Sequence, residues 1–190
     1  MPTVNQQTER ETNADRFDPF NDRLSRDVRN ALSVAFMDTL ERNELLPVHR
    51  IAEFFMDDAL PEAIKQYIQT RVKAYARVLA DLSDRHLDDP IDIAMVIWDR
   101  GLFFETHEFL EQYWLPATGE KKTLFQALIR AAGAYVHMEQ GNLRSAGRIA
   151  AKAIYGLERT QALLAVHTDP KPLIDKLRQL DPVPPRLSPF

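Results

Sequence analysis

Apolar residues recur at helical spacing through most of the chain. In residues 25–40 they fall three, four or seven positions apart, which is typical of one buried stripe along an α-helix; the stripe is Val28, Ala31, Leu32, Ala35, Phe36 and Leu40. Pro47 and Pro61 each stand where a further helix can begin, because the first turn of a helix tolerates proline. The first part of the chain therefore predicts three helices.

The rest of the chain shows the same periodicity, interrupted by residues that end helices. Gly101, the turn at residues 116–120 and Gly141 separate the apolar segments, as glycine and proline commonly do. No pair of segments shows the alternation that is typical of paired strands. The prediction is an all-α fold, an irregular array of about seven helices with antiparallel helical hairpins in the C-terminal half. In this half we expect helices at about residues 91–100, 102–115, 123–140 and 142–164, and a short one at 172–180.

Composition divides the chain into four parts. Residues 1–24 mix charged and amide side chains without periodicity, so we expect a mobile N-terminal arm. The charged stretch SDRHLDDP at residues 83–90 is the best candidate for a linker. We therefore predict an N-terminal helical segment at residues 25–85 that packs on the rest, a helical domain at 86–180 and a Pro-rich tail at 181–190.

Overall composition narrows the function classes. Of the 190 residues, 45% are hydrophobic and 27% charged, the balance of a globular protein. No cysteine is present, which excludes disulfides, thiolate zinc sites and cysteine nucleophiles. A net charge of -4 argues against a nucleic-acid partner. The polar N-terminus lacks the apolar core of a signal peptide, and no apolar run could cross a bilayer, so we expect a soluble cytoplasmic protein with no membrane partner.

The segment at residues 103–114 carries the densest candidate chemistry. With an advance of about 100° per residue from Phe104 at zero, His107 falls at about 300°, Glu111 at about 340° and Trp114 at about 280°. These three side chains then lie within an apolar arc, with Glu108 at its edge. Burying a carboxylate is costly unless a partner compensates it, so the arrangement predicts a polar partner on a neighbouring helix.

The expected helix at 123–140 offers such a partner. Gln126, Arg130, Gly133 and His137 follow one another at spacings of four, three and four residues, which aligns them in one polar row. If the two helices pack antiparallel, Arg130 could neutralise Glu111 or Glu108, and His137 could approach His107. Gly133 would permit close approach of the backbones.

These residues resemble a known family. The run from Gly101 to Trp114, followed by FQALIRAAGAYVHMEQGNLRSAGRIAAKAI, is similar to the family called domain of unknown function 309. The shared features are His107, Glu108, Glu111 and Trp114 on one helix, and His137 before a Gly141–Asn142 break. The resemblance spans roughly residues 89–180, and the chain departs from it at Ala127, often glycine there, and at Arg130, often glutamine. It implies a small helical array and no established reaction.

Two functions remain open for these residues. The leading hypothesis is a binding or interaction module, for a protein or a small molecule, in which a buried His/Glu/Trp/Gln network fixes helix register or shapes a pocket; it needs no cofactor. The alternative is a metal-assisted hydrolase. In that case His107, Glu111 and His137 are the candidate metal ligands, and Glu108 is the base that activates water on a divalent metal.

Two further features concern partners. Arg144, Arg148, Lys152 and Arg159, with Tyr155 among them, form a basic stripe at helical spacing. The stripe could hold phosphate or an acidic partner, or it could be a solvated face paired with acidic neighbours. It lacks the interleaved aromatics of single-strand nucleic-acid binding. Surplus apolar surface would favour a homodimer; the candidates are Phe54, Phe55 and Phe125.

Overall fold

The computed structural model describes residues 16–188, and within them the regular secondary structure is all helical, without strands. The chain divides into two compact units, Met1–Leu79 and Ala80–Phe190, with the boundary inside a helix. The predicted all-α class is confirmed. The described residues contain nine helices where about seven were expected.

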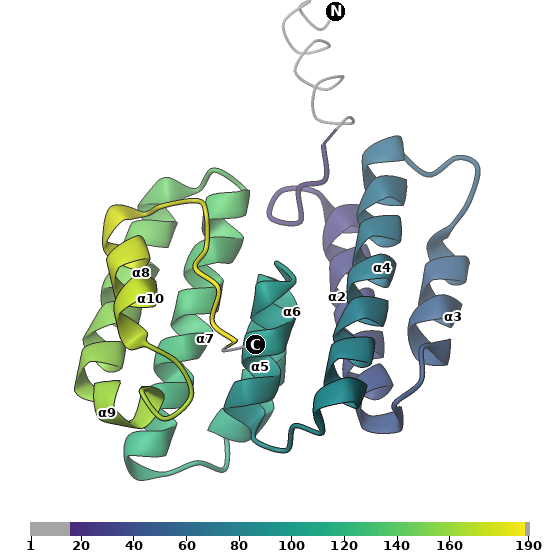
Figure 1. Cartoon of the computed structure of the whole chain (residues 1–190). Helices are drawn as coiled ribbons and strands as arrows, with labels where there is room; N and C mark the ends of the chain where they lie inside the picture. Colours follow the sequence, from purple (N-terminus) through teal and green to yellow (C-terminus); the bar gives the residue numbers. More distant parts are fainter. Residues whose placement is uncertain (1–15, 189–190) are drawn as a thin grey trace, which may run out of the picture. The chain divides into compact units, whose positions relative to one another are not determined.

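The described part of the first unit consists of a turn and three helices (Figure 1). Helix α2 (Arg23–Arg42) begins at Asp22, whose side chain accepts the Ser25 amide hydrogen at 2.6 Å. It is followed by α3 (Leu46–Phe55), with Pro47 in its first turn, and by α4 (Glu62–Arg85). Of the predicted stripe, Val28, Leu32, Ala35 and Phe36 are buried in α2, whereas Ala31 and Leu40 are half-buried. Phe36 stacks on Tyr75 of α4 with 4.3 Å between ring centroids, which joins the two helices through the core of this unit.

The predicted N-terminal arm is only partly described, because residues 1–15 lie outside the described residues. In the remainder, Asp18 closes a turn by accepting the amide hydrogens of Phe20 and Asn21. Phe17 stacks on the ring of Tyr67 in α4 at 3.6 Å between centroids. The packed backbone therefore begins before residue 24, where the arm was expected to end.

The second unit holds six further helices, whose packing follows chain order. Helix α6 packs on α5 and α7, and α7 packs on α8, which also contacts α10 (Figure 1). Gly141, with φ of 73°, turns the chain between α7 and α8 in a conformation that only glycine adopts freely. The helices are α5 (Pro90–Asp99), α6 (Phe103–Trp114), α7 (Gly119–Glu139), α8 (Leu143–Arg159), α9 (Gln161–Leu164) and α10 (Pro170–Gln179).

Two helix boundaries differ from the expectation. Helix α7 begins at Gly119 and not near residue 123, because Thr118 is extended and Gly119 adopts a φ of 61°. The single helix expected at 142–164 is two helices. The break falls at Thr160, whose hydroxyl donates to the Gly156 carbonyl oxygen at 2.9 Å. A threonine hydroxyl that bonds to the carbonyl four residues earlier slightly destabilises and often bends a helix at that point.

Trp98 of α5 lies at the centre of the second unit. Its ring meets Phe103 and Tyr135 edge-on, at 4.9 and 5.0 Å between centroids. Its indole N–H donates to the carbonyl oxygen of Pro185 at 2.9 Å. The tail at residues 181–188 has no regular structure, as predicted, and Leu187 is buried with its amide hydrogen on Asp99 at 2.7 Å.

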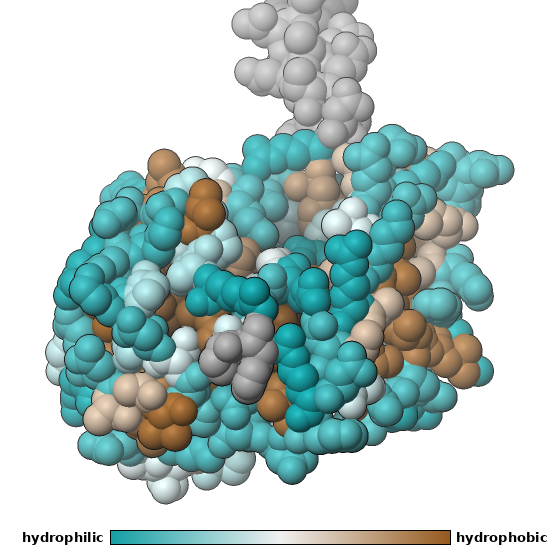
Figure 2. All heavy atoms as spheres, viewed as in Figure 1, coloured by the Kyte–Doolittle hydropathy of each residue, from teal (hydrophilic) through white to brown (hydrophobic). Residues whose placement is uncertain are grey.

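The surface bears on the partner predictions. Phe54 is 80% exposed, whereas Phe125 is buried in α7 and leaves no surplus apolar surface. In the face viewed in Figure 2, hydrophilic residues predominate over α8 and α10. None of the helices in residues 16–188 combines the length and the apolar character that a transmembrane helix requires.

Candidate functional site

Helix α6 turns a different face inward from the one that the spacing suggested. Its buried residues are Phe103, Glu105, Thr106, Phe109 and Leu110. On the same angular scale they span about 100–260°, so His107, Glu111 and Glu108 lie on the opposite side. The side chains of these three residues are 31%, 45% and 39% exposed. The expected buried polar network is therefore a half-exposed polar cluster.

This α6 cluster, formed by His107, Glu108 and Glu111, lies against α7 at one point. The Nδ1–H of His107 donates to the Ile129 carbonyl oxygen at 3.3 Å. A Cβ added to Gly133 would stand 3.8 Å from the same nitrogen, so the imidazole rests on the backbone of α7. The structure thus brings His107 to the polar row of α7 through Gly133.

The other ring nitrogen of His107 faces the two carboxylates. Its Nε2 lies 3.4 Å from Oε1 of Glu111 and 4.0 Å from Oε1 of Glu108. With the hydrogen on Nδ1, the Nε2 lone pair points toward negative oxygens, an arrangement that suits a bound cation. One ligand atom from each residue lies within 4.8 Å of the others, and the exposed side is open to water.

Other predicted members lie apart from this cluster. Among the described residues, no hydrogen bond or ion pair joins Gln126 or Arg130 to His107 or Glu111. His137 is not part of the α6 cluster. Burial lowers the pKa of His137, and the positive charge of Arg148 on α8 lowers it further.

Trp114 ends α6 and is half-buried. Its indole N–H is buried without a hydrogen-bond partner among the described residues. The ammonium group of Lys122 in α7 lies 5.3 Å from the ring centroid, a cation–π distance. Trp114 therefore contacts α7 at Lys122, about two turns before Ile129, the residue that His107 contacts.

The buried carboxylate of α6 is one that the sequence analysis did not consider. Glu105 is fully buried, on the same side as Thr106 and Phe109. Its position, two residues before His107, places it about 200° around the helix from that residue. The spacing of residues 103–114 was compatible with a buried Glu105. Because apolar residues lie on both sides of α6, the sequence did not show which side faces inward.

The basic stripe of α8 is exposed along its whole length. Arg144, Arg148, Lys152 and Arg159 lie opposite the buried residues Ala146, Ala150 and Ala153. Within residues 16–188, none of the four has a carboxylate within ion-pair distance; the neighbouring Glu158 pairs with Arg178 of α10 instead. Two of them donate hydrogen bonds to neutral side chains, Arg148 to Ser145 and Arg159 to Tyr155.

Comparison with known proteins bears on this part of the chain. Residues 91–149 match the model of a family described as a domain of unknown function, DUF309. The match runs from the first turn of α5 into α8 and includes the α6 cluster, Trp114 and His137. The resemblance that these residues suggested is thereby confirmed over this segment. No curated protein and no solved structure matched the chain.

Proposed function

We propose that this chain is an interaction module that docks an acidic segment of a partner protein on the basic stripe of α8. The observation that carries the proposal is the absence of a carboxylate partner for Arg144, Arg148, Lys152 and Arg159 within the described part of the chain. This is unexpected in a chain with 28 acidic and 24 basic residues. Cations of one sign along a line create a local positive potential that attracts an anionic partner.

The spacing of the stripe suits a helical partner. Its cations are four, four and seven residues apart, or about 6, 6 and 10 Å along the axis. Carboxylates one or two turns apart on a second helix repeat at the same distances. The opposite face of α8 packs its alanines and Gly156 closely on α7, so the stripe is presented by a fixed backbone. A fixed surface loses less conformational entropy on binding.

An acidic protein segment suits the stripe better than a nucleic acid does. Tyr155 is the aromatic residue of the stripe, and the Arg159 guanidinium covers its ring at 5.4 Å from the centroid. A covered ring is not available to stack on a base. The net charge of -4 also opposes a long polyanion more than a short acidic segment.

The test uses a labelled helical peptide with glutamates one turn apart, titrated by fluorescence anisotropy. We expect binding that weakens with salt, and a loss of at least about tenfold in affinity for Lys152→Glu. Lys73→Glu, the same charge change at an exposed lysine of α4, is the matched control and should bind like the parent. Equal loss in both variants would contradict the proposal. Stronger stripe-dependent binding of a single-stranded oligonucleotide would assign the stripe to nucleic acid.

The α6 cluster supports a second candidate, the metal-assisted hydrolase. The observation that favours it is the Nε2 of His107 facing Glu108 and Glu111, with ligand atoms within 4.8 Å and an exposed side for water. Elemental analysis of protein purified without a histidine tag should then show a near-stoichiometric metal. Hydrolysis of a nitrophenyl ester should fall in Glu108→Gln. Metal-free protein, or turnover unchanged in that variant, would contradict it.

Self-association remains a proposal that rests on α3. Phe54 is 80% exposed there, and two copies could cover it. Light scattering should give twice the monomer mass, and Phe54→Ser should return the monomer. A parent protein that is monomeric at high concentration would contradict the dimer. We propose the cytoplasm as the compartment of this interaction, which cell fractionation tests.

A further inference from the structure

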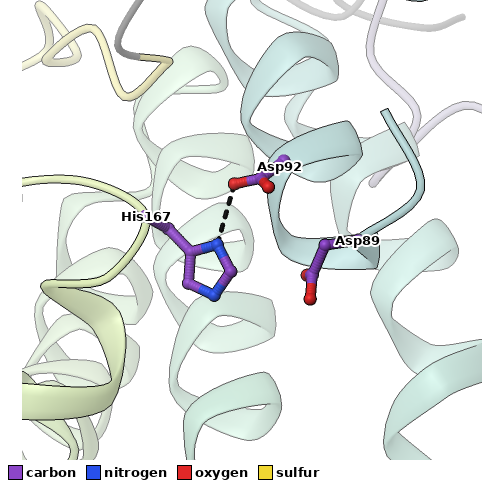
Figure 3. Close-up of side chains that lie close together, drawn as sticks. All are labelled: Asp89, Asp92 and His167. Carbon is purple, nitrogen blue, oxygen red and sulfur yellow. Dashed lines mark hydrogen bonds and ion pairs between the residues drawn. The ribbon is translucent and has the colours of Figure 1, made fainter. Parts of the chain in front are cut away.

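A second group of metal-ligating side chains lies in the second unit, outside the α6 cluster. Asp89 and Asp92 belong to the start of α5, and His167 to the loop between α9 and α10. Figure 3 shows the three side chains gathered at the start of α5. One ligand atom from each lies within 4.8 Å of the others, although His167 is 75 residues from Asp92.

Backbone hydrogen bonds hold both contributing segments in place. Asp89 is the N-cap of α5, and its Oδ1 accepts the Ile91 amide hydrogen at 2.8 Å. The amide of His167 donates to the Leu164 carbonyl oxygen at 2.9 Å, in the turn that follows α9. Asp169 then caps α10. The donors are therefore set by the fold on both sides, as a metal site requires.

The electrostatics of the group call for a cation. The Nδ1 of His167 lies 2.8 Å from Oδ1 of Asp92, and these side chains are 13% and 29% exposed. A carboxylate oxygen of Asp89 and one of Asp92 lie within 4.8 Å of each other and repel in this partly buried setting, and the helix N-terminus offsets about half a charge. The imidazole of His167 adds a nitrogen ligand to the two carboxylates. A divalent ion would neutralise both carboxylates.

We propose that Asp89, Asp92 and His167 bind one first-row divalent transition-metal ion, with Zn²⁺ as the probe. One imidazole nitrogen and two carboxylate oxygens match the ligands of such ions, whereas Mg²⁺ and Ca²⁺ prefer oxygen alone. The ion would tie the loop before α10 to the start of α5. This inference is independent of the acidic partner proposed for α8.

The test is calorimetric titration of the full, chelator-treated chain with ZnCl₂. Asp89→Asn is the sharpest variant, because asparagine keeps the N-cap acceptor and removes the charge. We expect the parent to bind Zn²⁺ at this site, and the affinity of this site to be at least about tenfold weaker in Asp89→Asn and in His167→Gln. His107→Gln removes the α6 cluster and should keep this site. MgCl₂ should give no binding at the same concentration.

Three results would overturn the proposal. They are no Zn²⁺ binding by the parent, binding unchanged in Asp89→Asn and His167→Gln, and binding lost only in His107→Gln, which would assign the ion to α6. Unfolding of each variant in chelator separates loss of the ion from loss of the fold. In chelator, Asp89→Asn should be as stable as the parent. Its Zn²⁺ affinity therefore still tests the proposal if His167→Gln proves unstable.

Discussion

A methyl group added to Gly156 tests how closely α7 and α8 pack. The added Cβ would stand 2.7 Å from Cβ of Ala127, with the Ala127 Cα at 3.5 Å and the Thr123 carbonyl oxygen at 3.7 Å. Non-bonded carbons prefer about 3.5–4.0 Å, so the helices would have to separate by roughly 1 Å at this point. No side-chain rotation can relieve the clash, because every neighbouring atom is backbone or Cβ.

The expected cost follows from two opposing effects. Overpacking a rigid contact costs about 2–3 kcal/mol. Replacing glycine by alanine inside a helix stabilises the folded state by about 1 kcal/mol. Gly156→Ala should therefore lower the free energy of unfolding by about 1–2 kcal/mol and the melting temperature by roughly 2–8 °C.

Gly133→Ala is the matched control at the His107 contact. There the added Cβ would meet His107 Nδ1 at 3.8 Å and Ile149 Cγ2 at 3.9 Å, both ordinary contacts. Only the helical gain remains, so this variant should be more stable than the parent by about 0.5–1 kcal/mol. The two substitutions, chemically identical and on neighbouring helices, should act in opposite directions.

Urea unfolding followed by tryptophan fluorescence measures the effect. Trp98 and Trp114 are the two tryptophans of the chain, and both belong to the unit Ala80–Phe190, so the signal reports this unit. Ala127→Gly in the Gly156→Ala background should recover part of the loss, as a direct contact requires. A Gly156→Ala protein as stable as the parent would refute the close packing of α7 on α8.

Three further substitutions test the second unit. The hydroxyl of Tyr135 is buried without a hydrogen-bond partner among the described residues. Tyr135→Phe should therefore leave the free energy of unfolding unchanged or raise it by up to about 1 kcal/mol, and a decrease would contradict this. Burial, and then Arg148, lowers the pKa of His137 below 6.5, so the unfolded chain binds the proton first and stability should fall as the pH drops below 6.5. His137→Gln should make denaturation midpoints between pH 7 and 5 less dependent on pH, and an unchanged slope would count against it. Asp99→Ala should cost about 2 kcal/mol and speed hydrogen exchange at the amide of Leu187, which donates to Asp99 at 2.7 Å; unchanged exchange would show that the tail is held otherwise.

Helix α6 shows where inference from the sequence stops. Its helical character was predictable from its spacing and from Gly101 before it. Its inward face was not, because aromatic residues occur around most of the helix: Phe104 at about 0°, Phe109 at about 140°, and Phe103 and Trp114 together at about 260–280°. Either arc could be buried on periodicity alone. Packing on α5 and α7 decides between them, and it buries Glu105 instead of Glu111.

The sequence by itself determined the features that depend on neighbouring residues. The all-α class, the turns at Gly101 and Gly141, the irregular tail and the resemblance over residues 91–149 follow from spacing and neighbouring residues. Each depends on interactions within a few positions, which the order of residues states directly.

Tertiary structure alone decided which distant side chains meet. Asp92 with His167, and Asp99 with the amide of Leu187, are separated by 75 and 88 residues. Nothing in helical periodicity relates such positions, because their approach depends on the packing of every helix between them. That the stripe of α8 has no carboxylate within ion-pair distance among residues 16–188 is visible only in space for the same reason. A carboxylate from any part of the folded chain could pair with a surface cation. The sequence alone therefore does not show which cations lack such a partner.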